Sequence, residues 1–551
     1  MASGVSLETN SEMGWMTPER ERRLLILLFL VGFLLRAYPV LWSSAHYNPS
    51  AWGFHPDEPK LVRHVDDFPE SIHTYKDYRY PTLIPFTYGV VWMGVGGALD
   101  LGDPEASMPG TPSYEAALLF SRGLTLLLFG LGGMWLTWAF TKRLFGPGPA
   151  LFALGATNLM GLPVTSASLV QTDVPSTVLL LASLYLLIGL PKAAREWRVR
   201  DLALVGFTLG AAAAAKYTAV IGALPILCVV VFAALRKETT WRAGSKLLVT
   251  AGLASITGLL IFVPGILYDF ESFKKGLNYE LHSKILENPG SLADLWGALS
   301  RSYPVWVLLP AALGLFIALK RNSSVFLGGL IFCMATFSIV WSRKLMPDHA
   351  IFFFPFVAAF AGLFLWRALT LKPRGAVPLC LVALFVLGHG YSGWVVHQRY
   401  AGDVRYQLSA WIEENIPPGP VGVSPSAMRP PSTIQLPEGY ELASVHTKPE
   451  WVIVYKEHYN LVRRATEDPA GYLEEISWLL EGHPEDAVVL EPGARRMGRL
   501  RERDFRFYED VMLKERREFD YDEVLYLESE KLPLDQLGRP IYVFRRSGAG
   551  G

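Results

Sequence analysis

Apolar runs long enough to cross a bilayer constrain this chain most. Runs of about 17–25 residues, the length of a membrane-spanning helix, recur between Leu24 and Val396. The 551 residues are 51% hydrophobic and 19% charged, which is more apolar than a soluble domain requires. The remainder, from residue 398 onward, has mixed charge and no such run. We therefore predict a membrane domain over 24–397, preceded by a short polar tail over 1–23 and followed by a smaller globular domain over 398–551.

The membrane domain is predicted to be mainly α, a multi-pass bundle of eleven spanning helices. The first run follows a basic flank, but it is too long for a signal-peptide core and lacks a small-residue cleavage site, so we expect it to be retained. The predicted spans are 24–42, 116–140, 150–165, 174–190, 201–215, 217–235, 247–267, 303–319, 324–341, 350–368 and 376–396.

Basic clusters set the predicted orientation. Under this count they all fall on the same side as Arg20–Arg23, which the positive-inside rule makes cytoplasmic. An odd number of spans then puts the C-terminal domain outside. The apolar stretch Thr82–Leu99 would invert every later loop if it crossed, so we interpret it as a juxtamembrane or re-entrant helix. Residues 43–115 then form one long outer loop.

The C-terminal part alternates helical and strand patterns, which predicts a small extracytoplasmic α/β domain. Helices are expected over 404–415 and 469–480, and strands over 421–423, 451–455, 487–490, 523–527 and 541–544. Lys plus Arg and Asp plus Glu number 51 each, so net charge gives no sign of a nucleic-acid partner. All three cysteines lie in apolar segments, so they do not reveal a redox compartment.

Asp57 and Glu58 are the leading candidates for chemistry. They follow the first span closely, and charge at the edge of hydrocarbon is costly enough to mark function. A carboxylate there could act as a general base toward a hydroxyl or amine. Two alternatives stay open: a solvated turn between Pro56 and Pro59, or a divalent-metal site, for which two carboxylates are a weak signal.

Asp173 and Lys216 lie at the outer ends of short apolar segments, on the same predicted face as Asp57. Asp173, in Thr172-Asp173-Val174-Pro175, could share a site with Asp57 or could simply cap a helix. Lys216 could hold a phosphate as a point charge or could extend toward water along the membrane surface.

Arg343, Lys344 and His349 lie in a short predicted outer loop. Positive charge on the outer side departs from the positive-inside trend, and an anionic lipid head group would explain it. Stray exposed charges are the alternative. Arg79 and Arg122, the latter inside an apolar run, are weaker candidates of the same kind.

Together these residues place one base and several cations at the outer face. Cations can stabilise a departing lipid phosphate while the acid deprotonates an acceptor, which is glycosyl transfer from a lipid-phosphate sugar. Two other classes stay open: a transporter or flippase of lipid-linked sugars, and a non-catalytic membrane subunit. Ionisable residues gathered at one face, without an internal repeat, favour the enzyme over a transporter.

The chain resembles the GT-C superfamily of membrane glycosyltransferases, specifically the family 39-like protein O-mannosyltransferase and aminoarabinose-transferase type. The matching motifs are Asp57-Glu58 after the first span, Tyr80-Pro81 before a juxtamembrane helix, Thr172-Asp173-Val174-Pro175, Lys216-Tyr217, and His349 to Pro355. Arg79-Tyr80-Pro81 departs from the Lys-Pro-Pro of aminoarabinose transferases, which counts against a lipid A acceptor.

This resemblance implies a polyprenyl-phosphate-linked sugar donor, no essential metal or other cofactor, and a cell-envelope role in a bacterial inner membrane. It implies that Asp57 is the catalytic base, supported by Glu58 and Asp173. It assigns the donor phosphate to cationic side chains, namely Lys216, Arg343, Lys344, His349 and Arg79. The sugar and the acceptor, whether glycan, lipid or protein, stay open.

Overall fold

The structure is a computed structural model of the chain. It describes residues 17–45, 58–75, 81–98, 112–191, 193–281, 302–321, 347–370, 387–397, 404–423, 441–443, 451–455, 521–527 and 541–546, together with a few single residues between these ranges. The chain divides into two compact units after His397. The first unit is helical, and the second contains a sheet.

Five helical stretches of the described residues are long and apolar enough to cross a membrane. They are Pro18–Leu41, Tyr114–Phe145, Tyr217–Leu235, Trp241–Phe262 and Ala350–Thr370. Three shorter apolar helices accompany them, at Leu83–Val95, Asp173–Ile188 and Val305–Lys320. The predicted span 324–341 lies outside the described residues except for Leu330, and only the end of the predicted span 376–396 is described, as a helix over 387–397.

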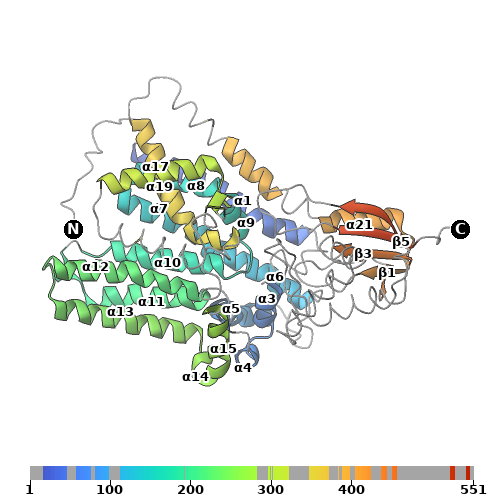
Figure 1. Cartoon of the computed structure of the whole chain (residues 1–551), viewed down its shortest axis with the longest axis horizontal. Coiled ribbons are helices and arrows are strands. Elements are labelled where there is room, and N and C mark those ends of the chain that lie inside the picture. Colours follow the sequence, from blue (N-terminus) through green and yellow to red (C-terminus); the bar gives the residue numbers. More distant parts are fainter. Residues whose placement is uncertain are drawn as a thin grey trace, which may run out of the picture. The chain divides into compact units, whose positions relative to one another are not determined.

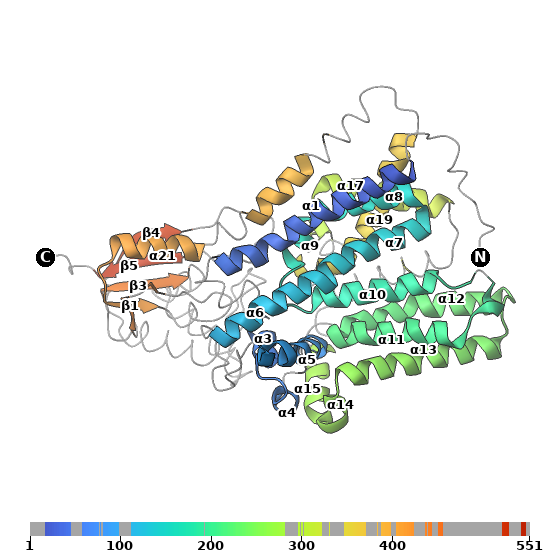
Figure 2. The ribbon, with the colours of Figure 1, turned by 180° about the vertical axis from the view of Figure 1, so that it is seen from behind.

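Helices α1 (Pro18–Ala45) and α7 (Gly132–Phe145) meet at one face of the first unit, where Lys142 Nζ lies 2.9 Å from Glu21 Oε1. Helix α6 (Pro112–Thr125) runs into α7 through a π-helical turn, Leu126–Leu131, so the predicted span 116–140 is one continuous helical stretch. Figure 2 shows α6 and α7 in line, with α1 beside them.

The predicted span 150–165 is wrong as a single helix. Helix α8 (Pro147–Asn158) ends after 12 residues, and the short helix α9 (Gly161–Ser166) follows a break at Leu159 and Met160. Pro163 explains part of the interruption, because it has no N–H to donate to the carbonyl of Leu159 four residues earlier.

A second group of helices packs closely side by side. It consists of α10 (Asp173–Ile188), α11 (Val199–Ala215), α12 (Ala223–Leu235) and α13 (Trp241–Phe262), as Figure 1 shows. A 3-10 turn, η4 (Tyr217–Gly222), joins α11 to α12. Glycines allow the contact between α11 and α13, because a Cβ at Gly206 would lie 2.0 Å from the Ala251 carbonyl oxygen.

Among the described residues, three helices lie between α1 and α6 in the chain: α3 (Glu58–Asp66), α4 (Ser71–Thr74) and α5 (Leu83–Ala98). Helix α5 corresponds to the predicted juxtamembrane helix and packs against α3, α6, α11 and α13. Two hydrogen bonds hold it in place: Tyr88 with Thr125, at 2.8 Å, and Thr82 Oγ1 to the Phe262 carbonyl, at 2.6 Å.

Further described elements of the first unit are α14 (Gly265–Tyr268), α15 (Phe270–Leu281), α17 (Val305–Arg321), the 3-10 turn η7 (Pro347–Phe353) and α19 (Phe354–Thr370). Helix α19 packs between α17 and α8. Eleven of its 17 residues are buried, from Phe354 to Leu363 and at Leu365. It is therefore a core helix of this unit.

The second unit contains helix α21 (Val404–Asn415) and a five-stranded sheet. The strands are β1 (Pro420–Val423), β2 (Glu441–Ala443), β3 (Trp451–Tyr455), β4 (Tyr521–Leu527) and β5 (Ile541–Arg546), in the order β2-β1-β3-β5-β4. Strands β2, β1 and β3 are parallel, and β5 runs antiparallel to β3 and β4.

Four strands and helix α21 lie where the sequence predicts them, and β2 was not predicted. The predicted helix 469–480 and strand 487–490 lie outside the described residues. Residues of α21 and of the first and third strands share one apolar core, which includes Leu408, Ile412, Val421 and Ile453.

Candidate functional site

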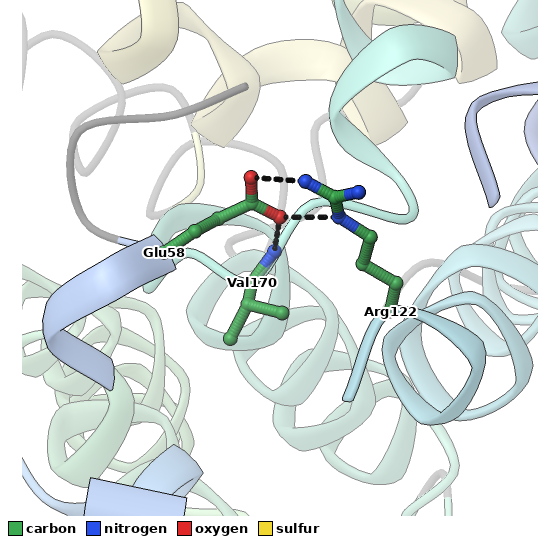
Figure 3. Close-up of polar contacts among 3 residues, drawn as sticks. All are labelled: Glu58, Arg122 and Val170. Carbon is green, nitrogen blue, oxygen red and sulfur yellow. Dashed lines mark hydrogen bonds and ion pairs between the residues drawn. The ribbon is translucent and has the colours of Figure 1, made fainter. Parts of the chain in front are cut away.

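Glu58 forms an ion pair with Arg122 in the interior of the first unit. Arg122 Nη2 lies 2.8 Å from Glu58 Oε2, and Arg122 Nε donates to Glu58 Oε1 at 2.9 Å. The Val170 amide donates to Glu58 Oε1 at 3.1 Å, as Figure 3 shows. Both charged side chains have 0% exposure. A buried carboxylate with this many charge-assisted partners is fixed in orientation.

Helix α3 brings Glu58 to this position. Glu58 begins the helix, where the N-terminal dipole favours a negative charge. Leu61, Val62 and Val65 are fully buried and hold α3 against α5 and α6. Because Arg122 belongs to α6, the ion pair joins the start of α3 to a membrane-length helix.

Asp173 and Lys216 form a second ion pair, with 2.5 Å between Lys216 Nζ and Asp173 Oδ1. Asp173 is the first residue of α10, one position after the N-cap residue Thr172, and its carboxylate pairs with Lys216. Lys216 ends α11 with an extended backbone, φ −156° and ψ 124°. The two side chains keep 11% and 17% exposure, so this pair is partly open where the Glu58 pair is closed.

One buried segment connects the two ion pairs. Val170, which binds Glu58, precedes Asp173 by three residues, which is at most about 11 Å of extended chain. Gln171 is fully buried and Thr172 is 3% exposed. Glu58, Asp173 and Lys216 therefore lie on neighbouring parts of the first unit.

Two further elements approach this region. Tyr217, next to Lys216, donates from its hydroxyl to the Tyr78 carbonyl at 2.9 Å, which places Tyr78 near the end of α11. The 3-10 turn η7, whose backbone includes His349, packs against α10 and α9. Burial raises the pKa of the Tyr78 hydroxyl well above its usual value, with Tyr268 and Asp269 adding to the shift.

Four of the predicted site residues lie outside the described residues: Asp57, Arg79, Arg343 and Lys344. Asp57 and Arg79 each have a described neighbour in the chain. Asp57 precedes Glu58, Arg79 follows Tyr78, and the two loop cations precede η7. Within the part of the chain that the structure describes, no group of three or more His, Cys, Asp or Glu side chains could hold a metal ion.

Sequence reasoning gave too little weight to Arg122 and missed the Val170 amide. A charged residue in the middle of an apolar run was the available signal for Arg122, because such a residue needs a partner inside the protein. A backbone donor carries no comparable signal, since every residue except proline has one.

Residues 119–268, less than half of the 551 residues, match the family model described as dolichyl-phosphate-mannose-protein mannosyltransferase. This region includes Arg122, Val170, Asp173 and Lys216. A sequence search of curated proteins found no match.

Several solved structures are similar at low sequence identity. ArnT from Cupriavidus metallidurans bound to undecaprenyl phosphate has a TM-score of 0.49 and 14% identity, covering 80% of this chain and 94% of that one. An oligosaccharyltransferase from Archaeoglobus fulgidus in the apo form has a TM-score of 0.47 and 14% identity, covering 74% of this chain. This chain spans 59% of the length of that archaeal protein. With TM-scores below 0.5, we draw no inference from these likenesses.

With spanning-length helices and a family match to its central region, the chain is a multi-pass integral membrane protein. The family recognition made from the sequence is confirmed over residues 119–268, which carry the pattern of the dolichyl-phosphate-mannose-protein mannosyltransferases, a family of membrane glycosyltransferases.

Proposed function

We propose that the protein transfers a sugar from a polyprenyl-phosphate donor to an acceptor at the extracytoplasmic face of its membrane. The observation that carries this proposal is the linkage of two ion pairs through residues 170–173. Glu58, adjacent to the proposed base Asp57, is bound to the segment that leads into Asp173 and its partner Lys216. A fixed acid and a partly open cation thereby lie on neighbouring parts of one site.

Asp57 acts as the general base in this proposal. Its Cα lies about 3.8 Å from that of Glu58 because the two residues are adjacent. Glu58 has both carboxylate oxygens bound by Arg122, and one of them also by the Val170 amide, so it is better suited to hold the chain in place than to accept a proton. Asp57 takes a proton from the acceptor, and Glu58 positions it.

Lys216 binds the donor phosphate. Its side chain keeps 17% exposure beside Asp173, which leaves room for a phosphate oxygen to approach. Arg343, Lys344, His349 and Arg79 add positive charge where the leaving phosphate develops negative charge. Asp173 holds the ammonium in place and limits its motion. No metal is assigned a role in this reaction.

The finer architecture belongs to the same proposal. We assign the GT-C fold with eleven spans, the N-terminus in the cytoplasm of a bacterium and the α/β unit outside the inner membrane. The family match over 119–268 supports this assignment. The ion pair between Glu21 and Lys142 also supports it, because it joins two of the basic regions that the topology places on the cytoplasmic side.

An assay of sugar transfer by the purified full-length protein tests the proposal. The protein is supplied with a polyprenyl-phosphate-linked sugar and membrane extracts as acceptor. Asp57→Asn should lower the rate at least 100-fold, on the order expected for loss of a general base. Asp67→Asn, which changes an acid in the same loop, should leave it within about 2-fold of the native rate, since an exposed Asp–Arg pair contributes little.

Transfer at the native rate by Asp57→Asn would refute the assignment of the base. The transporter alternative predicts a different pattern. Vesicles containing the protein would then move the lipid-linked sugar across the bilayer without transferring it, and Asp57→Asn would leave any transfer signal at background.

A further inference from the structure

Arg36 is a buried arginine in the middle of a membrane-length helix. It lies 13 residues beyond Arg23 in α1, which is about 20 Å along the helix axis. The hydrocarbon layer is about 30 Å thick, so Arg36 lies inside it. Its exposure is 2%. A charge at this depth is costly unless the protein supplies partners, which makes its function worth identifying.

The partners of Arg36 are uncharged and lie mainly at the end of α8. Nη1 donates to Asn158 Oδ1 at 2.8 Å and to the Gly32 carbonyl at 3.1 Å, and Nη2 donates to the Thr157 carbonyl at 3.1 Å. Asn158 Nδ2 in turn donates to the Leu28 carbonyl at 3.0 Å. Arg36 of α1 thus donates to α8, and Asn158 of α8 donates back to α1.

These contacts provide hydrogen-bond partners for backbone carbonyls at the end of α8. A helix that ends within hydrocarbon leaves its last carbonyl groups without partners, and no water is available to bind them. Leu159 N satisfies the Ala156 carbonyl at 3.0 Å, and Arg36 satisfies the Thr157 carbonyl. The C-terminal end of the helix dipole also favours a cation. Arg36 therefore caps α8.

Gly32 gives independent support for this interpretation. A Cβ at Gly32 would lie 2.6 Å from Asn158 Oδ1 and 2.2 Å from Met134 Cε. Met134 has a flexible side chain that can move, but Asn158 is held by Arg36 and the Leu28 carbonyl. The glycine therefore leaves the space that Asn158 needs to reach both partners.

The end of α8 leads directly into the candidate site. After α9, the chain continues through Ser168 and Val170 to Asp173, and the buried Val170 amide binds Glu58. The position along the membrane normal at which α8 ends therefore sets where this segment begins. Helices α1 and α8 both start near the Glu21–Lys142 ion pair, so a contact between Arg36 of α1 and the end of α8 fixes that position.

We infer that Arg36 is a positioning residue of the site: by capping α8 at Asn158 it places residues 168–173 against Glu58 and Lys216. This inference rests on the proposed function for its effect on catalysis, although the placement itself can be measured without any reaction.

Cysteine labelling measures the placement. In a variant whose three native cysteines are replaced by alanine, Ser168→Cys reports on the segment and Ser71→Cys on the distant helix α4, both being fully buried sites. Arg36→Met should raise the maleimide labelling rate at position 168 on the order of 10-fold, through local opening, and leave the rate at position 71 unchanged. An unchanged rate at 168, or an equal rise at both sites, would overturn the inference.

Two milder variants keep the test decisive if Arg36→Met does not fold. Arg36→Lys keeps the charge but cannot donate from two separate nitrogens, so it should give a smaller rise at position 168. Gly32→Ala should act in the same direction, whereas Gly132→Ala, where a Cβ meets nothing within 4 Å, should not. A Gly32→Ala variant indistinguishable from Gly132→Ala would count against the role of Asn158.

Transfer kinetics connect the placement to function. Arg36→Lys should lower kcat on the order of 10-fold to 100-fold, with little change in the donor KM, because misplaced catalytic groups lose reactivity while the donor still binds. An unchanged kcat alongside increased labelling would show that the segment needs no fixed position, which would overturn the inference. If the native protein transfers no sugar, the proposed function fails, and labelling still decides the placement.

Discussion

The buried pair of Glu58 and Arg122 allows stability and catalysis to be separated. Replacing Arg122 with Met keeps the Glu58 carboxylate fully buried and next to the Val170 amide but removes its ion-pair partner. Removing one member of a buried pair costs about 3–5 kcal/mol, because the desolvation penalty of the other member is no longer offset. Glu58→Met removes the carboxylate that pairs with the buried Arg122 and should cost a similar amount.

The double variant, with Met at both positions, removes both charges together. Apolar replacement of a whole buried ion pair is often neutral or stabilising, so the double variant should recover most of the stability lost by either single variant. It cannot recover the directed contact between Glu58 and the Val170 amide. We therefore expect it to fold like the native protein and to transfer sugar at least 10-fold more slowly, since misplaced groups cost at least this much.

Thermal unfolding in detergent, followed by tryptophan fluorescence, gives the order of stability. The native protein and the double variant should melt close together, and both single variants well below them. Transfer assays are then run on the same four preparations. Single variants that melt like the native protein would show that the pair is not buried as the structure has it. A double variant with native activity would show that the pair does not position the site.

Two further predictions concern the second ion pair and the helix packing. Lys216→Met should raise the donor KM on the order of 10-fold, because a charged hydrogen bond to phosphate contributes about 1.5–3 kcal/mol. Titration with a polyprenyl phosphate should show the same loss of affinity. Equal affinity of the native protein and the variant would exclude Lys216 as a phosphate ligand. Gly206→Ala should destabilise the protein by about 1–3 kcal/mol, because the added Cβ would overlap the Ala251 carbonyl. Gly252→Ala, where the added Cβ meets open space, should melt at the native temperature. Equal melting temperatures of the two variants would refute the close packing of α11 on α13.

Local patterns were sufficient for much of the helical framework and for individual strands. The predicted segment 217–235 coincides with a helical stretch over Tyr217–Leu235, and helix 404–415 coincides with α21, because hydrophobic length and periodicity are properties of adjacent residues. The break at Leu159 was not predicted, since an apolar composition continues across it. What ends α8 is a cap from a helix more than one hundred residues earlier, as the 122-residue separation of Arg36 and Asn158 shows.

The candidate residues of the site could be selected from local sequence. Asp173, Lys216 and Glu58 were recognisable because a charge beside hydrocarbon needs a reason to be there. Their partners could be identified only once the helices were packed in three dimensions. Glu58 binds Arg122 across 64 residues and Lys216 binds Asp173 across 43, and no local pattern encodes such distances. The physical reason is that a buried charge is stabilised by whichever opposite charge or dipole the fold brings near, and that choice is made only when the helices pack together.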